Sequence, residues 1–225
     1  MTVPSRITYE NPVSSARSSA PASSGADIAA GKDNGYLRAY AAEIKAAKIP
    51  VALSFGHEMN GHWYPWRYRH VPPSVFVAAW HVMHQVINAV DPHVLWVWTV
   101  NQVFGRARVL TAPVRAWWPG AAYVNWVGLD TYYTSPRATF ARAFAPTIRS
   151  IRSFTTRPIL LTETAAGPWA RALWQINNLF TNVRLYHLLG LIWFDQNGRQ
   201  QWYLDNRPAA LAAYHQGAIA FTRGG

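Results

Sequence analysis

Short apolar runs alternate with amphipathic stretches along most of this chain. The runs at 51–55, 94–100, 124–129, 159–162 and 190–194 are mostly apolar, as expected of strands that are covered on both faces. Between them, apolar residues recur at helical spacing, which predicts helices over 36–48, 74–90, 136–154 and 168–188 and from Pro208 onward. A shorter helical piece is predicted near 107–117. This alternation of strands and helices is typical of an α/β fold with a parallel sheet.

Proline stands at the predicted start of several helices. Pro136, Pro168 and Pro208 each stand where a helix is expected to begin, in keeping with the preference of proline for the first helical turn. Ser74 is the predicted N-cap of the helix over 74–90, and the following Asp91 and Pro92 are expected to end it.

Two of the predicted strands end close to a glutamate. Glu58 follows the apolar run at 51–55, and Glu163 follows the run at 159–162. The chain contains only four glutamates, so two of them at strand ends indicate a function for these carboxyl groups rather than a solvated surface. Trp63, Tyr64 and Trp66 come directly after Glu58, and aromatic rings pack against the C–H faces of sugars. Paired carboxyl groups beside aromatic rings predict a site that cleaves glycosidic bonds.

The string His57-Glu58-Met59-Asn60-Gly61, followed by Trp63 and Trp66, resembles the acid/base signature of glycoside hydrolase family 26. This is the family of β-mannanases and some related β-glycanases. The segments 96–101, 123–132, 162–164 and 192–195 resemble the later strands of the family in the same order, so the similarity extends over residues 26–215.

The resemblance implies a (β/α)8 barrel of the TIM type and a division of roles between the two glutamates. It implies that Glu58 is the acid/base and Glu163 the nucleophile of a retaining mechanism, in which the carboxyl groups lie about 5 to 5.5 Å apart. It also implies substrate-binding roles for His57, Asn60, Trp63, Asn101, Tyr132 and Trp193, with Tyr132 beside the nucleophile.

Simpler interpretations exist for several of these residues. His57 can be a buried histidine that bonds backbone groups, and Asn60 and Asn101 can cap turns. Most of the tryptophans are expected to be core residues, although Trp66, Trp98 and Tyr133 are further candidates for sugar contacts.

The predicted strands are too few for a complete barrel. Five strands are evident, residues 7–9 offer a weak sixth, and a TIM barrel has eight. We therefore predict an incomplete barrel that contains strands four to eight, either because the barrel is truncated or because its start is misassigned. Residues 1–25, rich in Ser, Ala and Pro, are predicted to be a flexible leader to a catalytic domain over 26–225. The strand at 51–55 would then be an apolar edge that favours oligomerisation or aggregation.

Composition and short sequence features limit which partners and which cellular location are expected for this chain. The formal net charge of +11 favours polyanions, but no recognisable nucleic-acid motif accompanies it, so specific nucleic-acid binding is not expected. His81 and His84 lack a third ligand at a recognisable spacing, so neither a metal nor another cofactor is predicted. No signal peptide and no membrane-spanning run are visible, whereas the family resemblance implies secretion.

The leading hypothesis is a retaining endo-glycosidase that hydrolyses β-1,4-mannan or a related β-glycan polysaccharide. Two alternatives stay open at this point. One is a non-catalytic, carbohydrate-binding remnant of such an enzyme, and the other is a nonspecific polyanion binder that acts through the excess of arginine.

Overall fold

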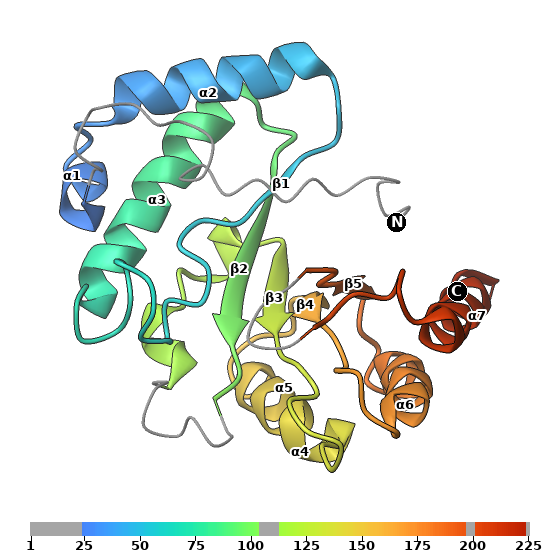
Figure 1. The fold of residues 1–225 in the computed structure, drawn as a ribbon. Helices are drawn as coiled ribbons and strands as arrows, with labels where there is room; N and C mark the ends of the chain where they lie inside the picture. Colours follow the sequence, from blue (N-terminus) through green and yellow to red (C-terminus); the bar gives the residue numbers. More distant parts are fainter. Residues whose placement is uncertain (1–23, 104–112, 197–200, 224–225) are drawn as a thin grey trace. The chain divides into compact units, whose positions relative to one another are not determined.

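Five strands and a series of helices alternate along the chain in the computed structural model, which describes residues 24–103, 113–196 and 201–223 (Figure 1). The strands are β1 (Ala52–Leu53), β2 (Leu95–Asn101), β3 (Trp126–Asp130), β4 (Ile159–Thr164) and β5 (Leu191–Trp193). They form one sheet in the order β1-β2-β3-β4-β5, and β1 pairs with β2, and β4 with β5, in parallel. This sequential order confirms the predicted α/β class and is the order found in a (β/α)8 barrel.

The helices lie between the strands, as predicted, but two of them begin several residues after the proline that was predicted to start them. They are α1 (Gly25–Ala29), α2 (Asn34–Ala47), α3 (Pro73–Val90), α4 (Phe140–Ala143), α5 (Ala145–Arg152), α6 (Ala172–Leu185) and α7 (Pro208–Arg223), with the 3-10 turns η1 (Val114–Trp117) and η2 (Ala121–Tyr123). No helix in the described ranges combines the length and hydropathy needed to cross a bilayer.

Four helix starts were predicted from a capping serine or a proline, and of these three were wrong and one was right. Helix α3 begins at Pro73 with Pro72 as its N-cap, so Ser74 lies inside the first turn. Pro136 and Pro168 both precede their helices by several residues, Pro136 in a turn and Pro168 in a bend, whereas Pro208 does begin α7. The predicted leader, apart from Ser24 and Gly25, and the weak strand at 7–9 lie outside the described residues.

The chain divides into two compact units, one of Met1–Val100 with Ala112–Val127 and the other of Asn101–Thr111 with Gly128–Gly225. In the first unit, α1 and α2 pack on α3 (Figure 1). The buried face of α3 carries Phe76, Trp80 and Ile87, and the Trp80 ring lies 5.8 Å from that of Trp96 in β2. The Trp80 indole N–H also donates to the Tyr123 carbonyl at 3.1 Å, so the helix is held both by apolar contact and by one directed bond.

In the second unit, α6 and α7 pack together beside β5 (Figure 1). Ile176 and Phe180 of α6 form a buried cluster with Leu204 and Ala210. Strand β4 is buried from Ile159 to Thr162, which agrees with the apolar sequence of its first three residues.

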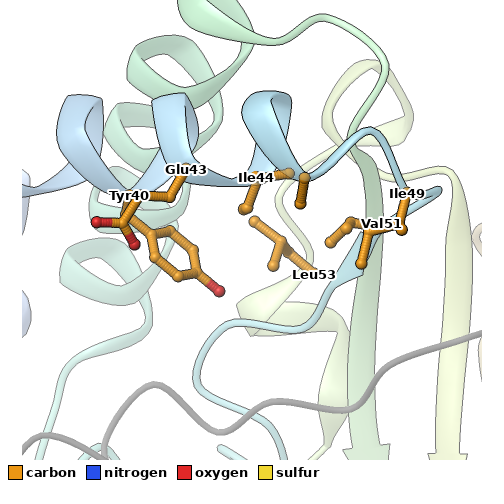
Figure 2. Close-up of a pocket in the computed structure, with 7 residues that line it drawn as sticks. Tyr40, Glu43, Ile44, Ile49, Val51 and Leu53 are labelled. Atoms are coloured by element: carbon orange, nitrogen blue, oxygen red, sulfur yellow. The ribbon is translucent and has the colours of Figure 1, made fainter.

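A groove runs along β1 in the first unit. Strand β1 is first in the sheet order, and within the described ranges no strand pairs with its other edge. The groove has a volume of about 210 Å³ and is lined by side chains of α2 and of the segment around β1, namely Tyr40, Glu43, Ile44, Ala47, Ile49, Val51 and Leu53 (Figure 2). The predicted association through this apolar edge stays a prediction.

Gly56 makes the turn that leads from β1 to Glu58 possible. Its φ is +54°, and a Cβ atom there would lie 2.7 Å from the Phe76 ring. We expect Gly56→Ala to lower the free energy of unfolding by about 2 to 4 kcal/mol, because it combines left-handed backbone strain with overpacking. Urea unfolding measures this change. Gly35→Ala is the matched control, since a Cβ atom meets nothing within 4 Å there; equal unfolding midpoints for both variants would contradict the argument.

Candidate active site

Glu58 lies in a tight turn after β1 and has an unusual backbone conformation. Its φ is +54°, in the left-handed region that costs a residue with a side chain about 1 to 2 kcal/mol. The turn is held by hydrogen bonds on both sides. The Glu58 N–H donates to the Thr99 carbonyl of β2 at 3.0 Å, and the Gly61 N–H donates to the Glu58 carbonyl at 2.8 Å. Thr99 is tied in turn to Ser54 by a hydroxyl–hydroxyl bond of 2.8 Å. Strain at a fixed carboxyl group is typical of functional sites.

The Glu58 carboxyl group is bonded to an aromatic donor. The Trp63 indole N–H donates to Glu58 Oε2 at 2.6 Å. Glu58 is 7% exposed, whereas Trp63 is 38% exposed, so the tryptophan lies between the buried carboxyl group and solvent. Trp63 therefore orients one carboxyl oxygen and still presents ring surface to solvent.

His57 and two aromatic rings support this turn from one side. The His57 ring lies 4.5 Å from Tyr64 and 5.6 Å from Trp66, and these two rings stack on each other at 4.6 Å. The Trp66 indole N–H donates to the His57 carbonyl at 2.7 Å. Burial lowers the pKa of His57 to about 4, so the imidazole is neutral near pH 7. A neutral imidazole adds no charge beside Glu58.

Glu163 lies near the carboxyl end of β4 in the second unit and also bonds an aromatic donor. The Tyr132 hydroxyl donates a short hydrogen bond to Glu163 Oε2. The backbone brings the two residues together, since the Thr131 N–H donates to the Glu163 carbonyl at 3.0 Å and the Tyr133 N–H donates to the Ala165 carbonyl at 2.9 Å. Burial raises the pKa of Glu163, and the bond from Tyr132 opposes that rise because it stabilises the ionised carboxylate.

A buried aspartate joins the strand ends in the second unit. Asp130 at the end of β3 has no exposed surface, and its Oδ1 accepts a 2.6 Å hydrogen bond from the Thr162 hydroxyl of β4. Asp130 and Thr162 stand two residues before Tyr132 and one before Glu163, respectively. This bond therefore fixes the two strands at the point where they present the tyrosine and the glutamate.

A family model that matches most of the chain identifies its family. The family model for Glycosyl hydrolase family 26 matches residues 19–219. The chain belongs to this family. The match confirms the resemblance carried by the string around Glu58.

Two curated relatives and one solved structure are similar to this family 26 chain. Endoglucanase H of Acetivibrio thermocellus is 27% identical over 208 residues, which are 84% of this chain and 22% of the relative. Mannan endo-1,4-beta-mannosidase A and B of Caldalkalibacillus mannanilyticus is 24% identical over 174 residues, which are 73% of this chain and 32% of the relative. The Cellulomonas fimi endo-beta-1,4-mannanase double mutant aligns with a TM-score of 0.66 at 19% identity, over 87% of this chain and 49% of that chain.

These relatives also explain the short sheet of the family 26 chain. The chain covers about half of the solved mannanase and less than a third of each curated relative's length. Its five strands in sequential order fit an incomplete (β/α)8 barrel, as predicted.

The remaining predicted site residues of this family 26 chain lie in different surroundings. Asn60 is fully buried beside Glu58, and Asn101 ends β2. The Trp193 ring packs 5.5 Å from Tyr214 of α7, and its indole N–H donates to the Trp202 carbonyl at 2.9 Å. The Trp193 side chain therefore lies on the side of β5 that faces α7. The substrate-binding roles of these three residues stay predictions.

Two further candidates for sugar contacts are core residues. Trp98 and Tyr133 have no exposed surface, and the Tyr133 hydroxyl donates to Asn178 of α6 at 3.0 Å. Neither ring has a face left for a sugar. Asp130 was not among the predicted site residues, nor were Phe194 and Trp202, whose rings lie 5.8 and 5.2 Å from that of Tyr132. A signal for Asp130 was present, since it directly follows the predicted strand at 124–129.

Proposed function

We propose that this chain is a retaining endo-glycosidase that hydrolyses β-1,4-mannan or a related β-glycan, with Glu58 as the acid/base and Glu163 as the nucleophile. The observation that carries the proposal is that each of the two glutamates has similar local surroundings. Each is at or after the end of a strand of the same sheet, and each has one carboxyl oxygen bonded by an aromatic side chain, Trp63 or Tyr132. Membership of family 26 supports the same assignment.

In the first step, Glu163 attacks the anomeric carbon of the sugar. The Tyr132 hydroxyl holds Oε2, which leaves Oε1 as the attacking oxygen. The bond from the anomeric carbon to the glycosidic oxygen breaks as the new ester bond forms. Glu58 gives its proton to the departing oxygen, so the leaving sugar departs as a neutral alcohol.

In the second step, Glu58 acts as a base and the ester is hydrolysed. The Glu58 carboxylate takes a proton from water, and the water oxygen attacks the anomeric carbon. The ester bond to Glu163 breaks, and Glu163 leaves as a carboxylate that the Tyr132 hydroxyl stabilises. Two inversions at one carbon give a product with the configuration of the substrate.

The relatives and the rings around Glu58 support a β-glycan as the substrate class. One similar protein is a mannan endo-1,4-beta-mannosidase and another is an endoglucanase, so both mannan and β-glucan are substrates to test. Trp63 is partly exposed beside the proposed acid/base and is suited to pack on a sugar ring.

The test is release of reducing ends by the purified chain from galactomannan, mixed-linkage β-glucan and β-1,3-xylan, with NMR of the first product to read its anomeric configuration. The proposal expects activity on galactomannan or β-glucan and a product that is initially the β anomer. An initial α anomer would refute the retaining mechanism. A folded chain that binds glycan without releasing product would instead have a binding function.

Gly61 allows the Trp63 ring to reach Glu58. A Cβ atom at Gly61 would lie 2.5 to 2.7 Å from three carbons of the Trp63 indole. We expect Gly61→Ala to push the indole aside and break its bond to Glu58, which lowers kcat/KM by about 10- to 100-fold. Steady-state kinetics of this variant and of Gly35→Ala measure the effect. Unchanged kinetics in a folded Gly61→Ala variant would show that the Trp63 bond is dispensable.

A further inference from the structure

Tyr132, which bonds the proposed nucleophile, contacts two rings from the part of the chain after β5. The Trp202 ring lies 5.2 Å from the Tyr132 ring at an interplanar angle of 30°, and the Phe194 ring meets it edge-on at 5.8 Å. Trp202 is 6% exposed. Because a phenol turns about only two side-chain torsions, rings packed against it limit where its hydroxyl can point.

Residues 201–207, called the Trp202 segment below, are fixed by polar anchors. Arg207, directly before α7, donates to three carbonyl groups. Its Nε bonds the Tyr203 oxygen at 2.6 Å, its Nη1 bonds Ala166 at 3.1 Å, and its Nη2 bonds Trp202 at 3.3 Å. Within the same segment, the Leu204 N–H donates to Asp195 Oδ1 at 2.7 Å.

Ala166 makes this arrangement relevant to the site. It stands three residues after Glu163 and forms an isolated parallel bridge with Tyr133. Arg207 therefore ties the Trp202 segment to the backbone that carries both Glu163 and Tyr132. The rigid guanidinium fork suits this role, since it presents several N–H groups in fixed directions.

We propose that Arg207 and Trp202 are positioning residues for the nucleophile: Arg207 fixes the Trp202 segment, and the Trp202 ring holds the Tyr132 hydroxyl on Glu163. The inference rests on the proposed role of Glu163, but the contacts that carry it lie in one unit and do not depend on catalysis. Neither residue touches the reacting atoms in this account. Their effect passes through Tyr132.

The test measures the pKa of Glu163 directly. With only four glutamates in the chain, carbon-13 labelling of the glutamate carboxyl groups gives few NMR signals, and Glu163→Gln identifies the one that matters. Loss of the Tyr132 donor in Tyr132→Phe removes a bond to the ionised carboxylate, so we expect the Glu163 pKa to rise by about 1 to 2 units. Trp202→Ala and Arg207→Lys are expected to raise it in the same direction, whereas Trp202→Phe keeps a ring and is expected to shift it less.

Two comparisons separate positioning from a simple loss of charge. Arg207→Lys keeps the positive charge but loses the fork, so a pure charge effect leaves the Glu163 pKa unchanged in this variant. In the double variant Tyr132→Phe with Arg207→Lys, positioning predicts no further rise, because the hydroxyl through which Arg207 acts is already gone. Arg171→Ala, which removes a guanidinium stacked on Trp174, controls for net charge.

The outcomes are distinct from those that test the proposed function. A Glu163 pKa that rises in Tyr132→Phe but stays unchanged in folded Trp202→Ala and Arg207→Lys overturns the inference, as do fully additive shifts in the double variant. If the wild-type chain is active, the acidic limb of kcat/KM should move to higher pH in the same variants, since Glu163 must be ionised to attack. If the chain is inactive, the NMR titration still decides the positioning role.

Discussion

Glu163→Gln is expected to lower the hydrolysis of the polysaccharide by about 10⁵-fold or more, because the amide cannot attack the anomeric carbon to form the ester intermediate. The amide has nearly the same shape as the carboxyl group and can still accept the Tyr132 hydrogen bond, so glycan binding should persist. Reducing-end release measures turnover, and isothermal titration with an oligosaccharide measures binding.

A second variant shows whether Glu163 acts as the nucleophile rather than as a structural group. Glu163→Ala opens space beside the anomeric carbon, and added azide should attack there directly to give the α-glycosyl azide from an activated aryl glycoside. Glu43→Gln is the matched control, since Glu43 is an exposed glutamate of α2 and should leave turnover unchanged. A Glu163→Gln variant with wild-type turnover would remove Glu163 from the mechanism.

Glu58→Ala is expected to act differently on different substrates. Hydrolysis of polysaccharide should fall by about 10²- to 10⁴-fold, because the sugar leaving group needs a proton as it departs. A dinitrophenyl glycoside needs no such proton, so the glycosyl-enzyme should form at nearly the wild-type rate and then accumulate, since no base activates water. Stopped-flow release of dinitrophenol should therefore show a burst.

Azide distinguishes this role from a general loss of structure. It needs no base, so it should restore turnover of the aryl glycoside by Glu58→Ala and give the β-glycosyl azide. An equal loss on both substrates without azide rescue would show that Glu58 is required for folding of the site rather than for proton transfer. Ser54→Ala, which removes a hydroxyl bonded to Thr99 near the Glu58 turn, tests how far the backbone anchor matters to the same rates.

Most of the fold could be predicted from local pattern, and the errors have physical causes. The mostly apolar runs located all five strands, although the strand limits differ from the predicted ones by up to two residues. The helix predicted over 136–154 is instead α4 and α5, which meet where Pro146 lacks the N–H that a continuous helix requires. Strand β1 is first in the sheet order, so among the described strands it pairs with β2 alone. Only Ala52–Leu53 take part in this pairing, and the strand is limited to these two residues.

The candidate site could be predicted in part. The two glutamates and Trp63 belong to short strings whose chemistry is recognisable without coordinates. Trp202 and Arg207 carry no such signal, because an aromatic residue and an arginine in an irregular segment look like many others in this chain. Trp193 was predicted from the same kind of string, yet its ring packs against α7.

The sequence by itself indicated which residues are candidates for chemistry here: scarce carboxyl groups at the ends of apolar strands, among many aromatic rings. The tertiary structure alone decided which ring serves which carboxyl group. The Trp63 indole bonds Glu58 five positions away, but the Tyr132 hydroxyl bonds Glu163 across thirty-one positions. Hydrogen bonds act only over about 3 Å, so partners distant along the chain are settled by strand pairing and side-chain packing rather than by spacing in the sequence.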